Sequence, residues 1–152
     1  MRLFPALLFV AMAVPAWAQS PPATIAIKPD VLIAARQSAY AMSAGAFGGM
    51  KNSIKAGEDV KPWADVADEM AEWAGVIPSL FPPGTEKGHD TKAKPAVFSD
   101  PTGFAKAAGV YADAAKKLAV AAKANDRAAF AAAFKETAKA CGACHKTYRE
   151  KE

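Results

Sequence analysis

The sequence of 152 residues has too little of several residue types to fit whole classes of protein. Its two cysteines are too few for a disulfide-stapled domain, and 52% hydrophobic residues exclude a disordered chain. Basic residues outnumber acidic ones by only 19 to 15 and form no cluster, so no nucleic-acid-binding face is expected. The composition therefore indicates one globular domain with a single core. Much of its apolar content is alanine, which favours helices but fills little volume, so another body is expected to occupy part of the interior.

The first eighteen residues have the pattern of a secretory signal peptide. Arg2 gives a positive start, Leu3–Val14 is apolar, and Ala16-Trp17-Ala18 has the small-x-small pattern that signal peptidase accepts. We expect cleavage after Ala18, export to the periplasm, and a mature single domain of residues 19–152. The alternative is a membrane anchor, but the apolar run is shorter than the ~20 residues of a spanning helix. No other segment of the sequence is apolar enough to cross a bilayer, so no membrane contact is expected after cleavage.

The rest of the sequence predicts four amphipathic helices, because apolar residues recur at spacings of three and four. Prolines at first-turn positions and Asp or Gly residues at the ends set their limits. We expect helices from Pro29 to about Lys55 closed by Gly57, from Pro62 until Pro78 stops it, from Asp100-Pro101 to Asn125, and from Asp126 to about Tyr148. No segment has a strand pattern. These helices predict an all-α, antiparallel (up-down-up-down) four-helix bundle, with a long loop over residues 79–99 of the kind that is usually functional.

Each predicted helix has a seam of residues expected to face the interior. The four seams are, in chain order, Ile33, Tyr40, Phe47 and Ile54; Trp63, Val66, Met70, Trp73 and Ile77; Phe104, Ala108, Tyr111, Ala115, Leu118 and Ala122; and Phe130, Phe134, Ala138, Cys141, His145 and Tyr148. The last seam contains the most reactive residues of the sequence.

The segment Cys141-Gly142-Ala143-Cys144-His145 holds both cysteines of the sequence. On a helix, a spacing of three places the two thiols on neighbouring turns of one face. Two thiols so placed can add to the two vinyl groups of one haem and form thioethers, while His145 presents an imidazole nitrogen to the iron. Cys-x-x-Cys-His is the attachment signature of c-type haem, so we expect one covalent haem c with His145 as iron ligand. A haem is also a flat apolar body of the kind that an alanine-lined interior leaves room for.

Other uses of two cysteines fit less well. A thioredoxin-like redox pair would follow a strand, and no strand is predicted. A zinc site would want a second pair of ligands, and the only other histidine of the sequence is His89 in the long loop. A disulfide between Cys141 and Cys144 would leave His145 unexplained. A haem-free thiol-redox protein stays as an alternative, which a colourless and fully alkylatable purified chain would establish.

With this motif near its C-terminal end, the sequence resembles the cytochrome c′ family of class II c-type cytochromes. The resemblance covers essentially the whole mature sequence and includes the CGACHKTYR segment Cys141–Arg149, the Arg36-Gln37 pair, the turn Phe81–Glu86 and the stretch Pro95–Asp100. It implies a periplasmic haem protein, commonly a homodimer through its first two helices. It also implies binding of nitric oxide or carbon monoxide, electron transfer, and no enzymatic activity.

The same resemblance places the distal side of the haem three residues after Gln37, at Tyr40. Low-spin relatives have methionine at this position, where it fills the sixth coordination site of the iron. Tyr40 is a poor neutral ligand but a bulky cover, which implies a pentacoordinate, high-spin iron open to small neutral gases. Tyr40 also fits as an ordinary core aromatic of the first seam, and the two roles are compatible because the seam of a haem bundle is the wall of its pocket.

The alternative function is a low-spin electron carrier with a sixth ligand from another residue. Candidate sixth ligands are Met42, Met50, Met70 and His89. Met42 lies about 200° around the helix from Tyr40, so we expect it to point away from the haem.

Further candidate haem contacts are charged or polar. Arg36 interrupts the first seam, and a buried arginine needs an anion nearby, which by the resemblance is a haem propionate. The alternative is a surface arginine on a helix edge. Arg149 lies four residues after His145 on the same face, and the resemblance places it on the proximal side of the haem. Thr91 and Glu86 in the long loop are further candidates for contacts with the propionates.

Overall fold

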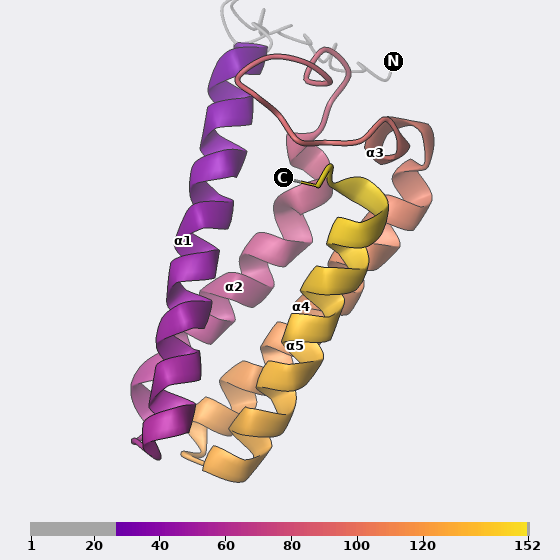
Figure 1. Ribbon diagram of the computed structural model, residues 1–152. Coiled ribbons are helices and arrows are strands. Elements are labelled where there is room, and N and C mark those ends of the chain that lie inside the picture. The colour runs from indigo at the N-terminus through magenta and orange to yellow at the C-terminus, as the bar shows by residue number, and fades with distance from the viewer. Residues whose placement is uncertain (1–26, 152) are drawn as a thin grey trace, which may run out of the picture.

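The computed structural model of the chain describes residues 27–151, and helices form its regular structure (Figure 1). Its elements are α1 Pro29–Ala56, the 3-10 turn η2 Lys61–Trp63, α2 Ala64–Val76, the 3-10 turn η3 Ile77–Leu80, α3 Ala96–Ser99, α4 Pro101–Lys123 and α5 Arg127–Tyr148. The long helices α1, α2, α4 and α5 alternate in direction, which confirms the predicted bundle (Figure 1). None of the helices in this range is long and apolar enough to span a membrane. The expected signal peptide and its cleavage site lie outside the described residues.

Gly57, Asp100 and Asp126 end or begin helices as predicted. Gly57 follows α1 in the left-handed region at φ 67°, where glycine has no steric penalty. Asp100 and Asp126 cap α4 and α5, each accepting a hydrogen bond of 2.9 Å from a first-turn backbone N–H. These caps were predicted from local sequence because the interactions that make them span three residues.

Two predicted boundaries differ from the structure. The second helix was expected to begin at Pro62, but Pro62 lies in the 3-10 turn η2 and α2 begins at Ala64. The α-helix ends at Val76, just before Pro78 as expected, and the chain continues through Pro78 as the 3-10 turn η3 to Leu80. Proline fits there because it occupies the start of a new turn, where its missing N–H has no helical partner to bond. The predicted loop 79–99 likewise contains the short helix α3, which begins after Pro95 and packs beside α4.

Alanine supplies much of the core, as the composition suggested. The predicted seam of α4 is buried throughout. In α2 the fully buried face consists of Ala67 and Ala74 with Met70 and Ile77 beside them, whereas Trp63 and Trp73 are only half-buried. Small residues on the facing surfaces let α2 and α4 approach closely, so the larger aromatic side chains lie at the edges of their contact.

The predicted core seam of α5 is wrong at Ala138 and His145, which are exposed. The residues that α5 buries are Phe130, Ala133, Thr137, Ala140 and Tyr148. The reason is that α5 has two apolar faces. One packs on α4, and the other, which carries Ala138, Cys141 and His145, borders a cavity.

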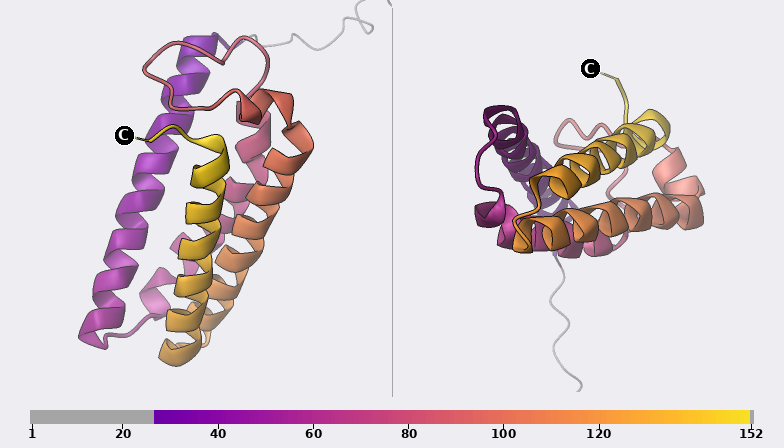
Figure 2. Two further views of the ribbon diagram at one scale, coloured as in Figure 1. Left: turned by 45° about the vertical axis from the view of Figure 1, so that its right-hand side comes forward. Right: turned by 90° about the horizontal axis from the view of Figure 1, so that it is seen from below.

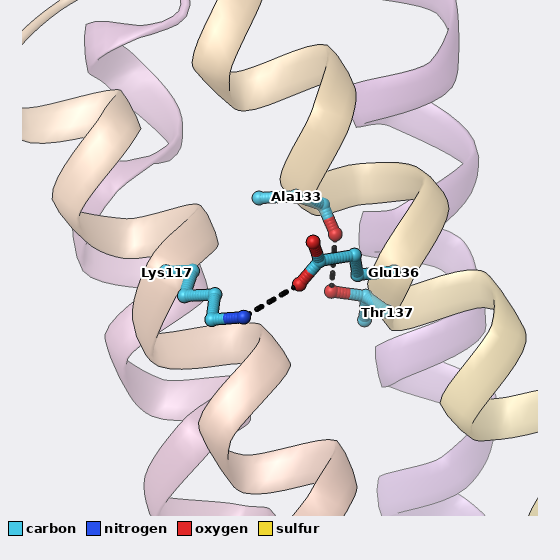
Figure 3. A network of polar contacts seen from close by, with 4 residues as sticks. All are labelled: Lys117, Ala133, Glu136 and Thr137. Atoms are coloured by element: carbon cyan, nitrogen blue, oxygen red, sulfur yellow. Dashed lines mark hydrogen bonds and ion pairs between the residues drawn. The ribbon is translucent and has the colours of Figure 1, made fainter.

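The contact between α4 and α5 is tied by polar groups (Figure 3). Lys117 Nζ of α4 lies 2.8 Å from Glu136 Oε2 of α5, and both side chains are exposed. Beside them, the fully buried hydroxyl of Thr137 donates to the backbone oxygen of Ala133 at 2.9 Å, so no polar atom of this side chain is left unpaired. Of these two contacts, the ion pair crosses from α4 to α5, whereas the hydrogen bond of Thr137 lies within α5. The other face of α5 borders the cavity.

The helix α1 contacts the rest of the bundle at fewer points than α4 contacts α2 and α5 (Figure 2). One such point is a stacked pair, in which the rings of Phe47 and Phe134 have centroids 3.9 Å apart. Another is Trp63, whose indole N–H donates to Ser53 Oγ at 3.1 Å. Between these contacts and the long loop, α1 and α5 form opposite walls of the cavity.

Candidate functional site

A cavity of about 660 Å³ lies between α1, α4, α5 and the long loop. This volume is within the range of pockets that enclose small organic ligands and cofactors. Its walls are mostly apolar, with alanines on all three helices. Eight of the nine residues predicted to contact or ligate a haem line it: Arg36, Gln37, Tyr40, Thr91, Cys141, Cys144, His145 and Arg149.

The ninth predicted residue, Glu86, does not line the cavity. Its side chain is exposed, and its Oε2 accepts a hydrogen bond of 2.8 Å from the backbone N–H of Gly84. Burial lowers the pKa of Arg36, and the negative charge of Glu86 offsets a small part of this lowering. Glu86 therefore shapes the loop and acts on the cavity through its charge.

The two thiols and the histidine of the motif face the cavity from the last turns of α5. Cys141 and Cys144 are free and half-buried, and burial raises the pKa of both thiols. For His145, burial lowers the imidazole pKa and the positive charge of Arg149 lowers it further. The helical spacing that predicted a shared face for the two thiols thus places them on the cavity wall, with His145 adjacent.

The end of α5 is held to the rest of the molecule by three contacts. Tyr148 Oη donates to Asp100 Oδ2 at 3.0 Å, beside the cap of α4. Lys94 N–H donates to the Tyr148 backbone oxygen at 3.0 Å, and Glu150 N–H donates to the Lys92 backbone oxygen at 2.8 Å. These two bonds form the isolated antiparallel bridge between Ala93 and Arg149. These contacts fix the position of the last turn, and with it the cysteines and histidine of the motif.

Arg36 is buried, with 2% of its surface exposed, although it is the most polar residue of its helix face. Its Nη1 donates to Leu80 O at 2.9 Å and to Thr85 Oγ1 at 3.0 Å, and its Nη2 donates to Thr85 O at 2.9 Å and to Thr91 Oγ1 at 3.0 Å. The guanidinium also lies 3.9 Å from the ring centroid of Phe81. Burial lowers its pKa.

The partners of Arg36 are all neutral. Within residues 27–151, no carboxylate forms an ion pair with its guanidinium. The predicted alternative of a surface arginine is wrong, because the long loop wraps over the side chain. A buried positive charge beside an apolar cavity favours an anionic group in that cavity.

The neighbouring Gln37 holds the tip of the same loop. Its Nε2 donates to His89 O at 2.8 Å. Three successive residues there, Gly88, His89 and Asp90, have positive φ values of 106°, 43° and 50°. His89 and Asp90 carry side chains in a region that L-residues rarely adopt, so this conformation depends on the contacts from α1.

Tyr40 lies one turn after Arg36 on the same wall. Its ring meets Trp73 of α2 edge to face, with centroids 5.4 Å apart. Burial raises the pKa of its phenol. Tyr40 lines the cavity from α1, and Cys141 and Cys144 line it from α5. Tyr40 therefore stands on α1 opposite the motif, as the resemblance implied.

The alternative sixth ligands differ in position. Met42 is 70% exposed, which confirms that it points away. Met50 is fully buried in the core and, like the exposed loop residue His89, does not line the cavity. Met70 is the one methionine of the described residues that does line it, from α2.

Some residues of the site were missed at the level of the sequence. Thr85 is 1% exposed and contributes two of the four acceptors of Arg36, yet it stands in a turn with nothing to mark it as buried. Tyr111 and Lys92 line the cavity from α4 and from the loop. Tyr111 was assigned to the core seam, and Lys92 resembles any surface lysine in sequence.

The residues present fit a large, flat, apolar group with anionic edges. The cavity has the volume and apolar walls for it, two thiols for covalent attachment, an adjacent imidazole for a metal, and a buried guanidinium for anions. Among the described residues there is no group of three or more His, Cys, Asp or Glu that would hold a bare metal ion instead.

Comparison with known proteins agrees with this fit. The sequence model of the family described as Cytochrome C′ matches residues 31–149. Cytochrome c′ of Rubrivivax gelatinosus is 41% identical over 126 residues, which cover 82% of this chain and 98% of that protein. The crystal structure of cytochrome c′ from Thermochromatium tepidum is 31% identical with a TM-score of 0.77, over 82% of this chain and 98% of the other.

Among the similar solved structures, a variant of cytochrome c′ from Alcaligenes xylosoxidans is described as a nitric oxide complex. It is 31% identical to this chain, with a TM-score of 0.74, over 82% of this chain and 98% of the other. Another variant of that protein is described as carbon monoxide bound, with 32% identity and a TM-score of 0.73 over the same shares.

Proposed function

Because the chain belongs to the cytochrome c′ family, we propose that its cavity holds one haem c and that the protein binds small neutral gases, transfers electrons, or does both. The observation that supports this most directly is that two thiols and a histidine on α5 face Tyr40 of α1 across one apolar cavity. When bound, the haem iron supplies reversible binding of a diatomic ligand and one-electron chemistry. The role is one of binding and electron transfer, and not of enzymatic catalysis.

The residues of α5 hold the haem. The thiols of Cys141 and Cys144 would hold it through two thioether bonds, one to each vinyl group. His145 presents its imidazole to the iron. Arg36, Gln37 and Thr91 line the opposite part of the cavity, where they supply the positive and polar surroundings of the propionates.

The opposite face of the iron is left to Tyr40, which gives a pentacoordinate, high-spin centre. A neutral phenol is a poor iron ligand, and its raised pKa keeps it neutral. The apolar surroundings disfavour charged ligands and admit neutral diatomics. Similar proteins with nitric oxide and carbon monoxide bound support this choice of ligands.

The second candidate is a low-spin electron carrier with Met70 as sixth ligand. It is favoured by one observation, which is that Met70 reaches the cavity wall from α2. An absorption spectrum of the purified, haem-loaded protein separates the two. A broad high-spin spectrum that shifts on addition of carbon monoxide supports the gas-binding protein. A sharp ferrous α-band with a methionine–iron charge-transfer band, unchanged by carbon monoxide, supports the carrier.

Two variants test the roles of the ligand residues. Tyr40→Ala should speed the association of carbon monoxide by opening the face above the iron, and an unchanged rate would show that Tyr40 does not cover it. His145→Ala should leave the thioethers in place but change the ferric spectrum. A wild-type ferric spectrum in that variant would refute the assignment of His145.

We also propose export to the periplasm with cleavage after Ala18, a single mature domain of residues 19–152, and a homodimer through α1 and α2. Val31 and Met42 support the dimer, because they are 56% and 70% exposed on α1. Mass spectrometry of the exported protein tests the cleavage site. Sedimentation of the wild type and of Met42→Glu tests the dimer, which the added charge should weaken.

A further inference from the structure

The hydroxyl of Tyr40 has no hydrogen-bond partner among residues 27–151, although Tyr40 is one of the residues that line the cavity. The ring is kept in place by its edge-to-face contact with Trp73. Tyr40 shares this cavity with Arg36 of α1, Tyr111 of α4, and Cys141 and Cys144 of α5. The hydroxyl is therefore directed into the space that these walls enclose.

The hydroxyl of a second tyrosine on the cavity wall, Tyr111, differs from that of Tyr40. Tyr111 of α4 also lines the cavity, but its hydroxyl has Ser43 of α1 as a hydrogen-bond partner. Burial raises the pKa of both phenols, that of Tyr111 to about 12, and that of Tyr40 by more. Both phenols stay protonated at neutral pH. The Tyr40 hydroxyl is therefore a hydrogen-bond donor without an acceptor among the described residues.

We propose that Tyr40 Oη donates a hydrogen bond to the ligand bound in the cavity opposite His145, and so selects neutral diatomic ligands whose outer atom accepts one. This inference rests on the proposed function and adds to it, because there Tyr40 acts only as a bulky cover. Hydrogen-bond donors on the distal side are one of the means by which haem proteins discriminate among diatomic ligands. In apolar surroundings such a bond is stronger than in water.

The test uses carbon monoxide as the probe on the reduced, haem-loaded protein, with Tyr40→Phe as the variant and Tyr111→Phe as the matched control. Phenylalanine keeps the ring and its contact with Trp73, and removes the hydroxyl alone. The infrared C–O stretching band should lie at lower frequency in the wild type and in Tyr111→Phe than in Tyr40→Phe. In heavy water the band should shift in the first two proteins and not in Tyr40→Phe.

The rate of carbon monoxide release should also separate Tyr40→Phe from the wild type and Tyr111→Phe. Tyr40→Phe should release carbon monoxide about threefold to tenfold faster, as expected for the loss of one hydrogen bond. Its association rate should stay at the wild-type value, since the ring still covers the site. An identical C–O band in the wild type and Tyr40→Phe, or an equal shift in Tyr111→Phe, would overturn the proposal. Failure to bind carbon monoxide at all would instead reject the gas-binding function itself.

Discussion

Replacing Arg36 tests whether the loop over the cavity is held by hydrogen-bond geometry or by charge alone. Its two terminal nitrogens make four hydrogen bonds of 2.9–3.0 Å to Leu80, Thr85 and Thr91. A terminal guanidinium nitrogen carries two protons, so all four of these donors are used by the loop. Only the Nε proton is left for an anion in the cavity. Arg36 is thus primarily a positioning residue, which fixes Thr85 and Thr91.

The loss of stability expected on replacing Arg36 follows from these four hydrogen bonds. Each contributes roughly 0.5–1.5 kcal/mol net, and the contact with Phe81 adds about 0.5–1 kcal/mol. Removing a buried cation offsets part of this loss, because its desolvation cost disappears too. We expect Arg36→Met to lower the free energy of unfolding by about 2–4 kcal/mol. Arg36→Lys should lower the free energy of unfolding by more than half of the amount expected for Arg36→Met, since one ammonium cannot reach Leu80 and Thr91 together.

The assay is urea unfolding of the purified haem-loaded proteins, with amide hydrogen exchange of residues 81–92 as a local readout. Arg127→Met is the matched control, because Arg127 is exposed and its Nη1 donates one hydrogen bond of 2.7 Å to Gly57 O. It should change stability by about 0.5 kcal/mol or less. If Arg36→Lys has wild-type stability and wild-type loop exchange, the charge alone suffices and the reasoning fails.

Three further predictions concern the scaffold. Gly49→Ala should destabilise the bundle by about 1–3 kcal/mol, since the added methyl carbon would lie 2.5 Å from the Trp63 ring, and thermal unfolding measures this. Asp100→Ala should cost about 1–3 kcal/mol through loss of the α4 cap and of the hydrogen bond from Tyr148, whereas a wild-type melting temperature would show that both are dispensable. The ion pair between Lys117 and Glu136 lowers the pKa of Glu136. The ion pair therefore stabilises the folded protein fully at pH values above the ordinary carboxyl pKa, and this stabilisation is lost as the pH falls through the lowered pKa of Glu136. Lys117→Met should remove this acid-side dependence from a stability–pH profile, and an unaltered profile would contradict it.

Sequence reasoning succeeded where the interactions are local. The caps at Gly57, Asp100 and Asp126, and the shared face of Cys141 and Cys144, depend on residues within four positions of each other. It failed on the seam of α5, because a helix can have two apolar faces and periodicity alone does not show which neighbour each one meets.

By itself, the sequence determined the helices, their caps and the chemistry of the Cys-x-x-Cys-His motif, because helical periodicity and side-chain type suffice for these. The tertiary structure decided what Arg36 and Tyr40 do. The hydrogen bonds of Arg36 join residues 44 to 55 positions apart, so no local pattern could reveal them. In the same way, the hydroxyl of Tyr40 became a free donor only once α1, α4 and α5 had enclosed a cavity around it and given the neighbouring Tyr111 a partner.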